Sequence, residues 1–169
     1  MIMTVTRLGT EAMAEVLSSA ETIAFTRCAI GSGTFNPNTS DPRDRTALIN
    51  QIASTGITIV RKEDDGVAVV ADMDNTIIPG GTAIRELGLF AKPNGGTEIL
   101  FAYGYTTSPE IVPPRSEATY ERRFISHIAM SDDQLELVVT YDTYAEAIFG
   151  ALGLSVVDGE LCQTYLEGE

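Results

Sequence analysis

The sequence has few of the residues on which metal centres, disulfide frameworks and membrane spans are built. It contains one histidine, His127, and two cysteines, Cys28 and Cys162, which lie near opposite ends of its 169 residues. Cysteines so far apart indicate neither a disulfide framework nor a metal site. No apolar run approaches the roughly 18 residues that a membrane-spanning helix needs, and the N-terminus lacks the pattern of a signal peptide. We therefore expect a soluble protein made in the cytoplasm.

Basic residues are also scarce. Lysine and arginine number 11 against 24 aspartates and glutamates, which gives a formal net charge of −13. A chain this acidic is repelled by phosphate backbones and by anionic lipid surfaces. The composition therefore argues against nucleic-acid and membrane partners. The excess of acidic residues keeps the protein soluble, or it forms a docking face for a basic partner protein.

The hydrophobic pattern predicts one helix followed by strands. Apolar residues at helical spacing predict a helix from Thr6 to Ala20, which Thr6 or Thr10 can cap. A strand over residues 22–31 then leads into a loop rich in turn residues, 31–45. Three hairpins follow, with turns at 63–66, 93–96 and 132–134, and with one strand running across 54–62. A proline-bearing loop is expected at 108–117, between the second and third hairpins.

We therefore predict an α+β fold, with the N-terminal helix packed on an antiparallel sheet or sandwich of six or more strands. Residues 1–144 form this domain. Residues 145–169 form an appendage, with a short helix within 143–154 and an acidic tail, that could dock a partner.

No pattern of catalytic residues emerges. His127 falls in an alternating strand pattern, where a histidine satisfied by a neighbour is commoner than a catalytic base, and no Gly-x-Ser-x-Gly motif is present. Asp72, Asp74 and Asn75 resemble a fragment of a calcium loop but lack its glycine and distal glutamate. Gly31 and Gly33 are better explained by a tight exit from a strand than by phosphate binding. We expect no enzyme, no metal and no cofactor; a hydrolase using Asp72, Asp74 or His127 is the least favoured alternative.

The stretch "TAIRELGLFA" places two charges in an apolar run. Strand alternation puts Arg85, Leu87 and Leu89 on one face and Ile84, Glu86, Gly88 and Phe90 on the other. Each charge then needs its own partner if it is buried, and Gly88 lets another group approach closely. We interpret Arg85, Glu86, Gly88 and Phe90 as a structural motif.

These residues carry a resemblance to the N-terminal domain of phage tail-collar fibre proteins. The matching elements are the opening Thr-x-x-Gly of the helix at Thr6–Gly9, the strand ending in Gly-x-Gly at Ala29–Gly33, and "IRELGLF" at Ile84–Phe90. "AYG" at Ala102–Gly104 and the prolines Pro113 and Pro114 complete the pattern. The resemblance covers residues 6–144, and "IRELGLF" is its specific part.

The resemblance implies a structural virion protein that forms a homotrimer in the phage tail and is made in the host cytoplasm. In that family the domain attaches a tail fibre or receptor-binding protein to the baseplate or tail tip. Because no shaft repeat or distal domain follows, we expect an adaptor between these proteins. The alternative is a module that binds the host surface, a carbohydrate or a protein, with Tyr103, Tyr105 and Tyr120 as its aromatic residues.

The candidate interface residues lie in two loops, 35–45 and 108–115, and in the C-terminal appendage. Arginine and aromatic residues are enriched at protein interfaces, and an apolar helix face needs burial. The appendage could pack on its own sheet equally well. The candidates are Phe35, Arg43, Arg45, Arg115, Ile148, Phe149, Leu152 and Leu154.

Overall fold

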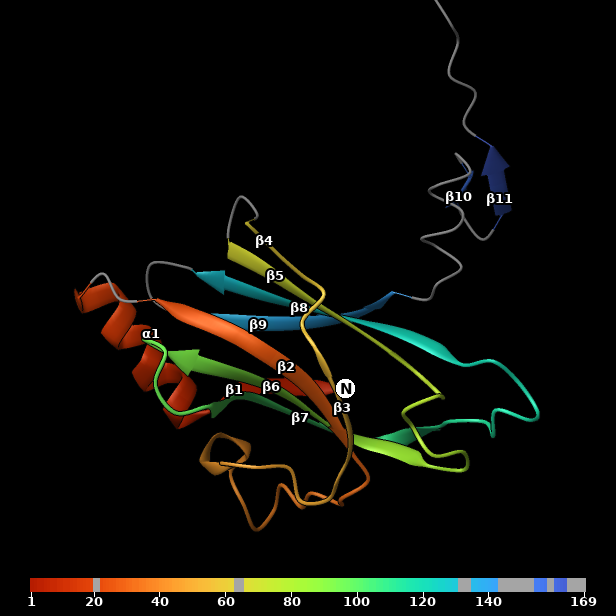
Figure 1. Cartoon of the computed structure of the whole chain (residues 1–169), viewed down its shortest axis with the longest axis horizontal. Coiled ribbons are helices and arrows are strands. Elements are labelled where there is room, and N and C mark those ends of the chain that lie inside the picture. Colours follow the sequence, from red (N-terminus) through yellow and green to blue (C-terminus); the bar gives the residue numbers. More distant parts are fainter. Residues whose placement is uncertain (20–21, 63–65, 131–134, 143–153, 158–159, 164–169) are drawn as a thin grey trace, which may run out of the picture.

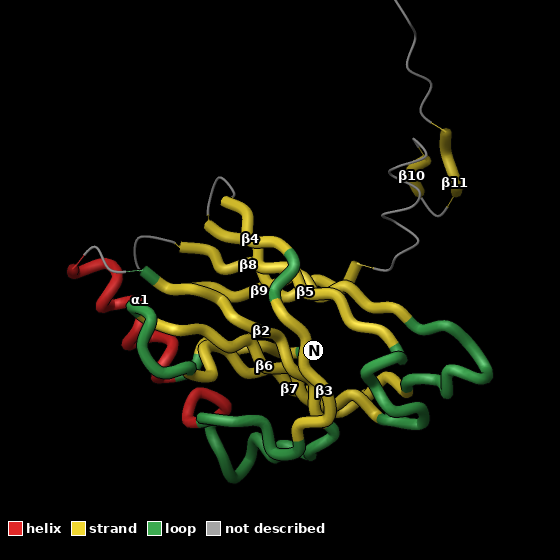
Figure 2. The backbone as a smooth tube through the Cα atoms, viewed as in Figure 1, coloured by secondary structure: helices red, strands yellow, loops and turns green. Residues whose placement is uncertain are grey.

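The computed structural model describes the chain except at residues 20–21, 63–65, 131–134, 143–153, 158–159 and 164–169 (Figure 1). Antiparallel strands make up most of the described part, together with the α-helix α1 (Arg7–Ser19) and the short 3₁₀ helix η1 (Pro42–Asp44) (Figure 2). This confirms the predicted α+β class at the level of its composition. Within the described ranges, no helix is long and apolar enough to cross a membrane.

Five antiparallel strands form the first sheet, sheet A, in the order β1-β7-β6-β2-β3. The strands are β1 (Ile2–Val5), β2 (Ile23–Gly31), β3 (Gln51–Gly56), β6 (Ala83–Pro93) and β7 (Ile99–Ile111). Asn94 and Gly95 close the β6–β7 hairpin with φ angles of 48° and 68°, the left-handed conformation that a tight hairpin turn requires. The predicted second hairpin is thus confirmed.

Four antiparallel strands form the second sheet, sheet B, in the order β4-β5-β8-β9. The strands are β4 (Ile59–Lys62), β5 (Gly66–Asp74), β8 (Glu121–Met130) and β9 (Leu135–Asp142). The pairs β4–β5 and β8–β9 confirm the other two predicted hairpins.

One predicted strand, across residues 54–62, is wrong. Ser54–Gly56 ends β3 in sheet A, whereas Ile59 begins β4 in sheet B. Between them Ile57 packs against buried clusters that both sheets contribute to. The chain therefore crosses from sheet A to sheet B at the partly buried Ile57, and alternation along a single strand cannot show such a crossing.

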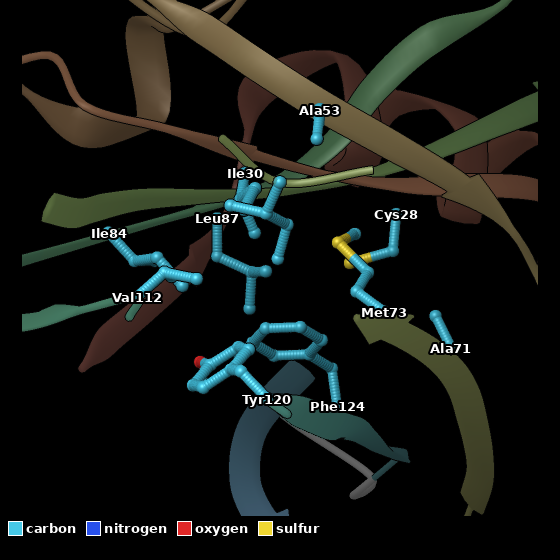
Figure 3. Close-up of a cluster of buried hydrophobic side chains, with 11 residues drawn as sticks. Cys28, Ile30, Ala53, Ala71, Met73, Ile84, Leu87, Val112, Tyr120 and Phe124 are labelled. Carbon is cyan, nitrogen blue, oxygen red and sulfur yellow. The ribbon is translucent and has the colours of Figure 1, made fainter. Parts of the chain in front are cut away.

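Two clusters of buried side chains lie between the sheets. In the first, Figure 3 shows Met73, Tyr120 and Phe124 facing Cys28, Ile30 and Leu87. In the second, Val69 and Ile128 of sheet B pack with Leu89, Ala91 and Ala102 of sheet A. Because each fully buried aliphatic or aromatic side chain contributes about 1.5–3 kcal/mol, these clusters hold the two sheets together.

The helix α1 lies against β7 and is preceded by a buried threonine, Thr6. Thr6 Oγ1 accepts a hydrogen bond from the Gly9 N–H at 3.0 Å and donates to the carbonyl oxygen of Leu100 in β7. Thr6 is therefore the N-cap. Thr10, the other predicted cap, lies one turn later and donates to the Thr6 carbonyl oxygen.

Three segments of the chain have more strand than the sequence predicted. Strand β1, which pairs with β7, precedes the first predicted element. Strand β7 continues to Ile111, so Ser108–Ile111 belong to a strand and not to the predicted loop. In the predicted acidic tail, β10 (Leu154–Val157) pairs with β11 (Glu160–Gln163). The predicted helix within 143–154 falls outside the described residues, except for Leu154, which begins β10.

Replacing the cap hydroxyl tests how α1 is joined to β7. We expect Thr6→Val to lower the free energy of unfolding by about 2 kcal/mol, because it leaves the Gly9 N–H and the Leu100 carbonyl without their buried partner. Urea unfolding followed by circular dichroism measures the change. The matched variant Thr10→Val should cost well under half as much, and equal costs would contradict the assignment of the cap.

Candidate functional site

A long loop covers the face of sheet A that points away from sheet B. This covering loop, residues 32–50, places Phe35 and Leu48 on Ala29, Phe90, Leu100 and Tyr103, and all six side chains are buried. The loop also contains η1. A segment rich in turn residues is thus held on the sheet by two apolar anchors.

A buried carboxyl group ties the covering loop to the sheet. Glu86, in β6, is 0% exposed. Its Oε2 accepts hydrogen bonds from the N–H groups of Gly33 at 2.8 Å and Asn50 at 3.0 Å. Its Oε1 accepts from the Ile49 N–H at 2.7 Å and the Tyr103 hydroxyl at 2.8 Å. All four partners are donors, so the group acts only as an acceptor, as an ionised carboxylate does.

Two glycines make this approach of loop and sheet possible. A Cβ atom on Gly33 would lie 2.4 Å from Glu86 Oε2, and one on Gly88 would lie 2.4 Å from the Leu48 side chain. Real Cβ contacts are not that short. A Cβ on Gly33 would also lie 2.5 Å from the Ile49 Cβ, so a larger residue there would force the covering loop to shift, whereas at Gly88 the ends of the Leu48 and Leu100 side chains would have to move. The Gly-x-Gly turn and the glycine of "IRELGLF" therefore serve one contact, between loop and strand.

Arg85 and Glu86 have different surroundings. Glu86 pairs across the sheet with Tyr105 and Ile84 pairs with Glu110, so the register shifts at Arg85, which is partly exposed. Ile84 consequently packs in the same inner cluster as Leu87. The prediction that Ile84 shares a face with Glu86 is wrong, because the irregular pairing of β6 with β7 at Arg85 interrupts the alternation.

Aromatic rings extend the buried site toward the surface. The Phe35 ring lies 5.6 Å from the Tyr103 ring and 4.7 Å from the Tyr105 ring, centroid to centroid. Burial and the hydrogen bond to Glu86 raise the pKa of Tyr103, so its hydroxyl stays a donor. On the same side of the sheet, the Arg27 guanidinium lies 3.5 Å from the Phe90 ring centroid and forms an ion pair with Glu98.

The structure buries Phe35, one of the candidate interface residues. Its exposed fraction is 7%, because its ring packs on the tyrosines. Arg45 donates to the Ala47 carbonyl oxygen and lies over the Tyr103 ring. Arg43 is exposed and pairs with Asp41, and its hydrogen bonds lower the pKa of that carboxyl to about 2. The composition of the loop indicated an interface, but it could not distinguish the buried Phe35 from exposed residues such as Arg43.

Arg115 is exposed in the loop that follows β7. Ile148, Phe149 and Leu152 lie outside the described residues. Leu154 begins β10, and its side chain is not among those described.

The residues considered for catalysis or metal binding form ion pairs, hydrogen bonds and strand pairs within the fold. Asp72 and Arg123 form an ion pair across β5 and β8 at 2.7 Å, and Asp74 accepts hydrogen bonds from Thr76. His127 pairs with Ala68 in the sheet register. Among the described residues, no group of three histidine, cysteine, aspartate or glutamate side chains could hold a metal ion. Burial raises the pKa of the Cys28 thiol to about 12, which makes it a poor nucleophile.

The comparisons with known proteins found no matching family model, curated protein or solved structure.

The site makes a specific prediction for Glu86. We expect Glu86→Gln to lower the free energy of unfolding by about 3 kcal/mol, because the amide –NH₂ of the new side chain faces donors that are buried against it. Guanidinium unfolding of the full chain measures the change. Glu117→Gln, at an exposed position of the loop after β7, is the matched control and should change stability by less than about 0.5 kcal/mol. A similarly small effect of Glu86→Gln would contradict the anchoring role.

Proposed function

We propose that this chain is a structural protein of a phage tail, an adaptor that anchors a tail fibre or receptor-binding protein to the baseplate or tail tip. The resemblance of "IRELGLF" and its neighbouring elements to tail-collar fibre proteins is the basis of the proposal. In this proposal residues 1–144 form a sandwich on which the N-terminal helix packs, and residues 145–169 receive the separately encoded fibre. The assembled form is a homotrimer in the virion.

One observation supports the proposal most directly: the glutamate of "IRELGLF" is fully buried and engaged by four donors. A carboxylate so placed orders a loop and does not face a substrate. The motif that carries the resemblance therefore has an architectural role, as expected of a scaffold that presents surfaces to other proteins.

The turn after β5 and the loop after β7 together offer an ordered surface for a partner protein. The Asn75 side-chain amide donates to the carbonyl oxygens of Pro113 and Ala118, which joins the turn after β5 to the loop after β7. Ile77 and Ile111 are 44% and 58% exposed at the same end of the molecule. Exposed aliphatic side chains on a rigid support, with Arg115 nearby in sequence, have the composition of a protein interface.

The proposal predicts the mass of the protein in solution. We expect the purified full chain to form a trimer near three times 18.1 kDa, in low and in high salt, since interfaces of permanent assemblies are large and apolar. Light scattering coupled to size-exclusion chromatography measures this mass. A monomer at both salt concentrations would contradict the trimer.

Particle location tests the adaptor role separately. Antibodies to the full chain should label the tail end of intact phage particles from the source of the sequence in negative-stain electron microscopy. Absence of the chain from purified particles, by labelling and by mass spectrometry, would overturn the proposed function whatever its oligomeric state.

A further inference from the structure

The turn between β6 and β7 is an Asn-Gly pair at the surface. The Gly96 N–H donates to the Pro93 carbonyl oxygen at 2.7 Å, and φ is 48° at Asn94 and 68° at Gly95. Positive φ at both central residues defines a type I′ turn. Asn94 and Gly95 are exposed, so solvent reaches the side chain of the first and the backbone of the second.

Asn94 also ties this turn to the segment that leads into β2. Its backbone N–H donates to the Thr22 carbonyl oxygen at 2.8 Å, and its side-chain Oδ1 accepts from the Thr22 N–H at 3.2 Å. Thr22 directly precedes β2, whose first residues pair with the end of β6. The carboxamide of Asn94 is therefore held toward Thr22 by one neutral hydrogen bond at an exposed position, where such bonds open readily.

The side chain of Asn94 and the backbone of Gly95 can react with each other. An asparagine carboxamide carbon is an electrophile, and the backbone nitrogen of the next residue is a nucleophile once a base in solution has taken its proton. A side chain on that next residue hinders the approach, but glycine has no Cβ. Within the described residues, the Gly95 N–H has no hydrogen-bond partner that would hold its proton.

We propose that Asn94 is a site of spontaneous deamidation in the folded protein, with the Thr22 hydrogen bond as its brake. The Gly95 nitrogen loses its proton to solvent and attacks Asn94 Cγ, forming an N–Cγ bond. The Cγ–Nδ2 bond breaks, and the leaving nitrogen takes up a proton and departs as ammonia. This closes a succinimide ring. Because the ring needs Cγ beside the Gly95 nitrogen, the bond from Oδ1 to Thr22 must open first.

Water completes the reaction by opening the ring at either carbonyl carbon. Cleavage of the new N–Cγ bond gives aspartate at position 94. Cleavage of the original peptide bond gives isoaspartate, in which the main chain runs through Cβ and Cγ. Water is the co-reactant, so the reaction needs neither an oxidant nor a second protein, and the inference does not depend on the adaptor role.

Three of the other asparagines are unsuited to this reaction. Asn36 precedes a proline, whose nitrogen has no proton to lose. Asn75 is 7% exposed, and its amide donates to two carbonyl oxygens. Asn50 precedes a glutamine, and its amide donates to Ser32 Oγ at 2.7 Å.

Asn38 is the matched internal control. It is exposed in a turn, as Asn94 is. The residue after it is Thr39, whose β-branched side chain crowds the backbone nitrogen. The two sites therefore differ chiefly in the residue that supplies the nucleophile.

Peptide mapping of the aged full chain tests the site. The protein is kept at physiological temperature in neutral and in mildly alkaline buffer, and the deamidated fraction at each asparagine is followed by mass spectrometry. We expect Asn94 to convert roughly tenfold faster than Asn38, because glycine leaves the nucleophile unhindered. The rate should rise in alkaline buffer, since the attack needs the deprotonated nitrogen. Conversion of Asn94 no faster than that of Asn38 would overturn the site.

Unfolding the chain in guanidinium chloride tests the brake. It removes the Thr22 hydrogen bond but keeps the Asn94–Gly95 sequence, so Asn94 should convert several-fold faster than in the folded chain. Equal rates in the two states would overturn the role of Thr22.

The two products should differ in stability. Aspartate keeps an oxygen that accepts from the Thr22 N–H, so Asn94→Asp should unfold at the same urea concentration as the unmodified chain. Isoaspartate adds a main-chain carbon to a tight turn, so the isoaspartyl form, separated by chromatography, should unfold at a lower urea concentration. An isoaspartyl form as stable as the unmodified chain would contradict the part that this turn plays in joining β6, β7 and β2.

Discussion

The attachment of the covering loop to sheet A depends on one buried carboxylate, that of Glu86. A charge removed from water is tolerated only where hydrogen bonds replace its hydration, and here three backbone N–H groups of the covering loop and one tyrosine hydroxyl do so. The same bonds satisfy backbone donors at both ends of the loop, at Gly33 and at Ile49 and Asn50. Glu86 thereby closes a loop that has little regular structure of its own, and the apolar anchors Phe35 and Leu48 pack that same loop on sheet A.

The consequences reach the surface along β7. Tyr103 donates to Glu86 and packs on Phe35, which in turn supports the ring of Tyr105. Tyr105 is the last residue of β7 that pairs with β6 before the register shift opposite Arg85. The position of the Tyr105 ring is therefore coupled to the buried site by direct ring contacts.

Local patterns predicted the elements, and long-range contacts decided the rest. The cap of α1, strand β2 and the three hairpins could be read from the sequence, because capping residues, alternation and turn residues act within a few positions. The crossing at Ile57, the register shift at Arg85 and the burial of Phe35 could not, since each depends on groups that are distant in sequence. The Gly-x-Gly turn and a glutamate in an apolar run were visible signals of the site, but nothing in either segment shows that they meet. The N–H donors of Ile49 and Asn50 leave no sequence signal at all.

Amide hydrogen exchange of the unmodified chain tests the central claim most directly, that Glu86 holds the covering loop to the sheet. If it does, the N–H groups of Gly33, Ile49 and Asn50 exchange only when the whole domain unfolds, at the rate of the core amides of β6 and far more slowly than the N–H of Asn38 in the exposed turn. If those three amides exchange as fast as that of Asn38, the loop opens independently of the sheet and the claim is contradicted.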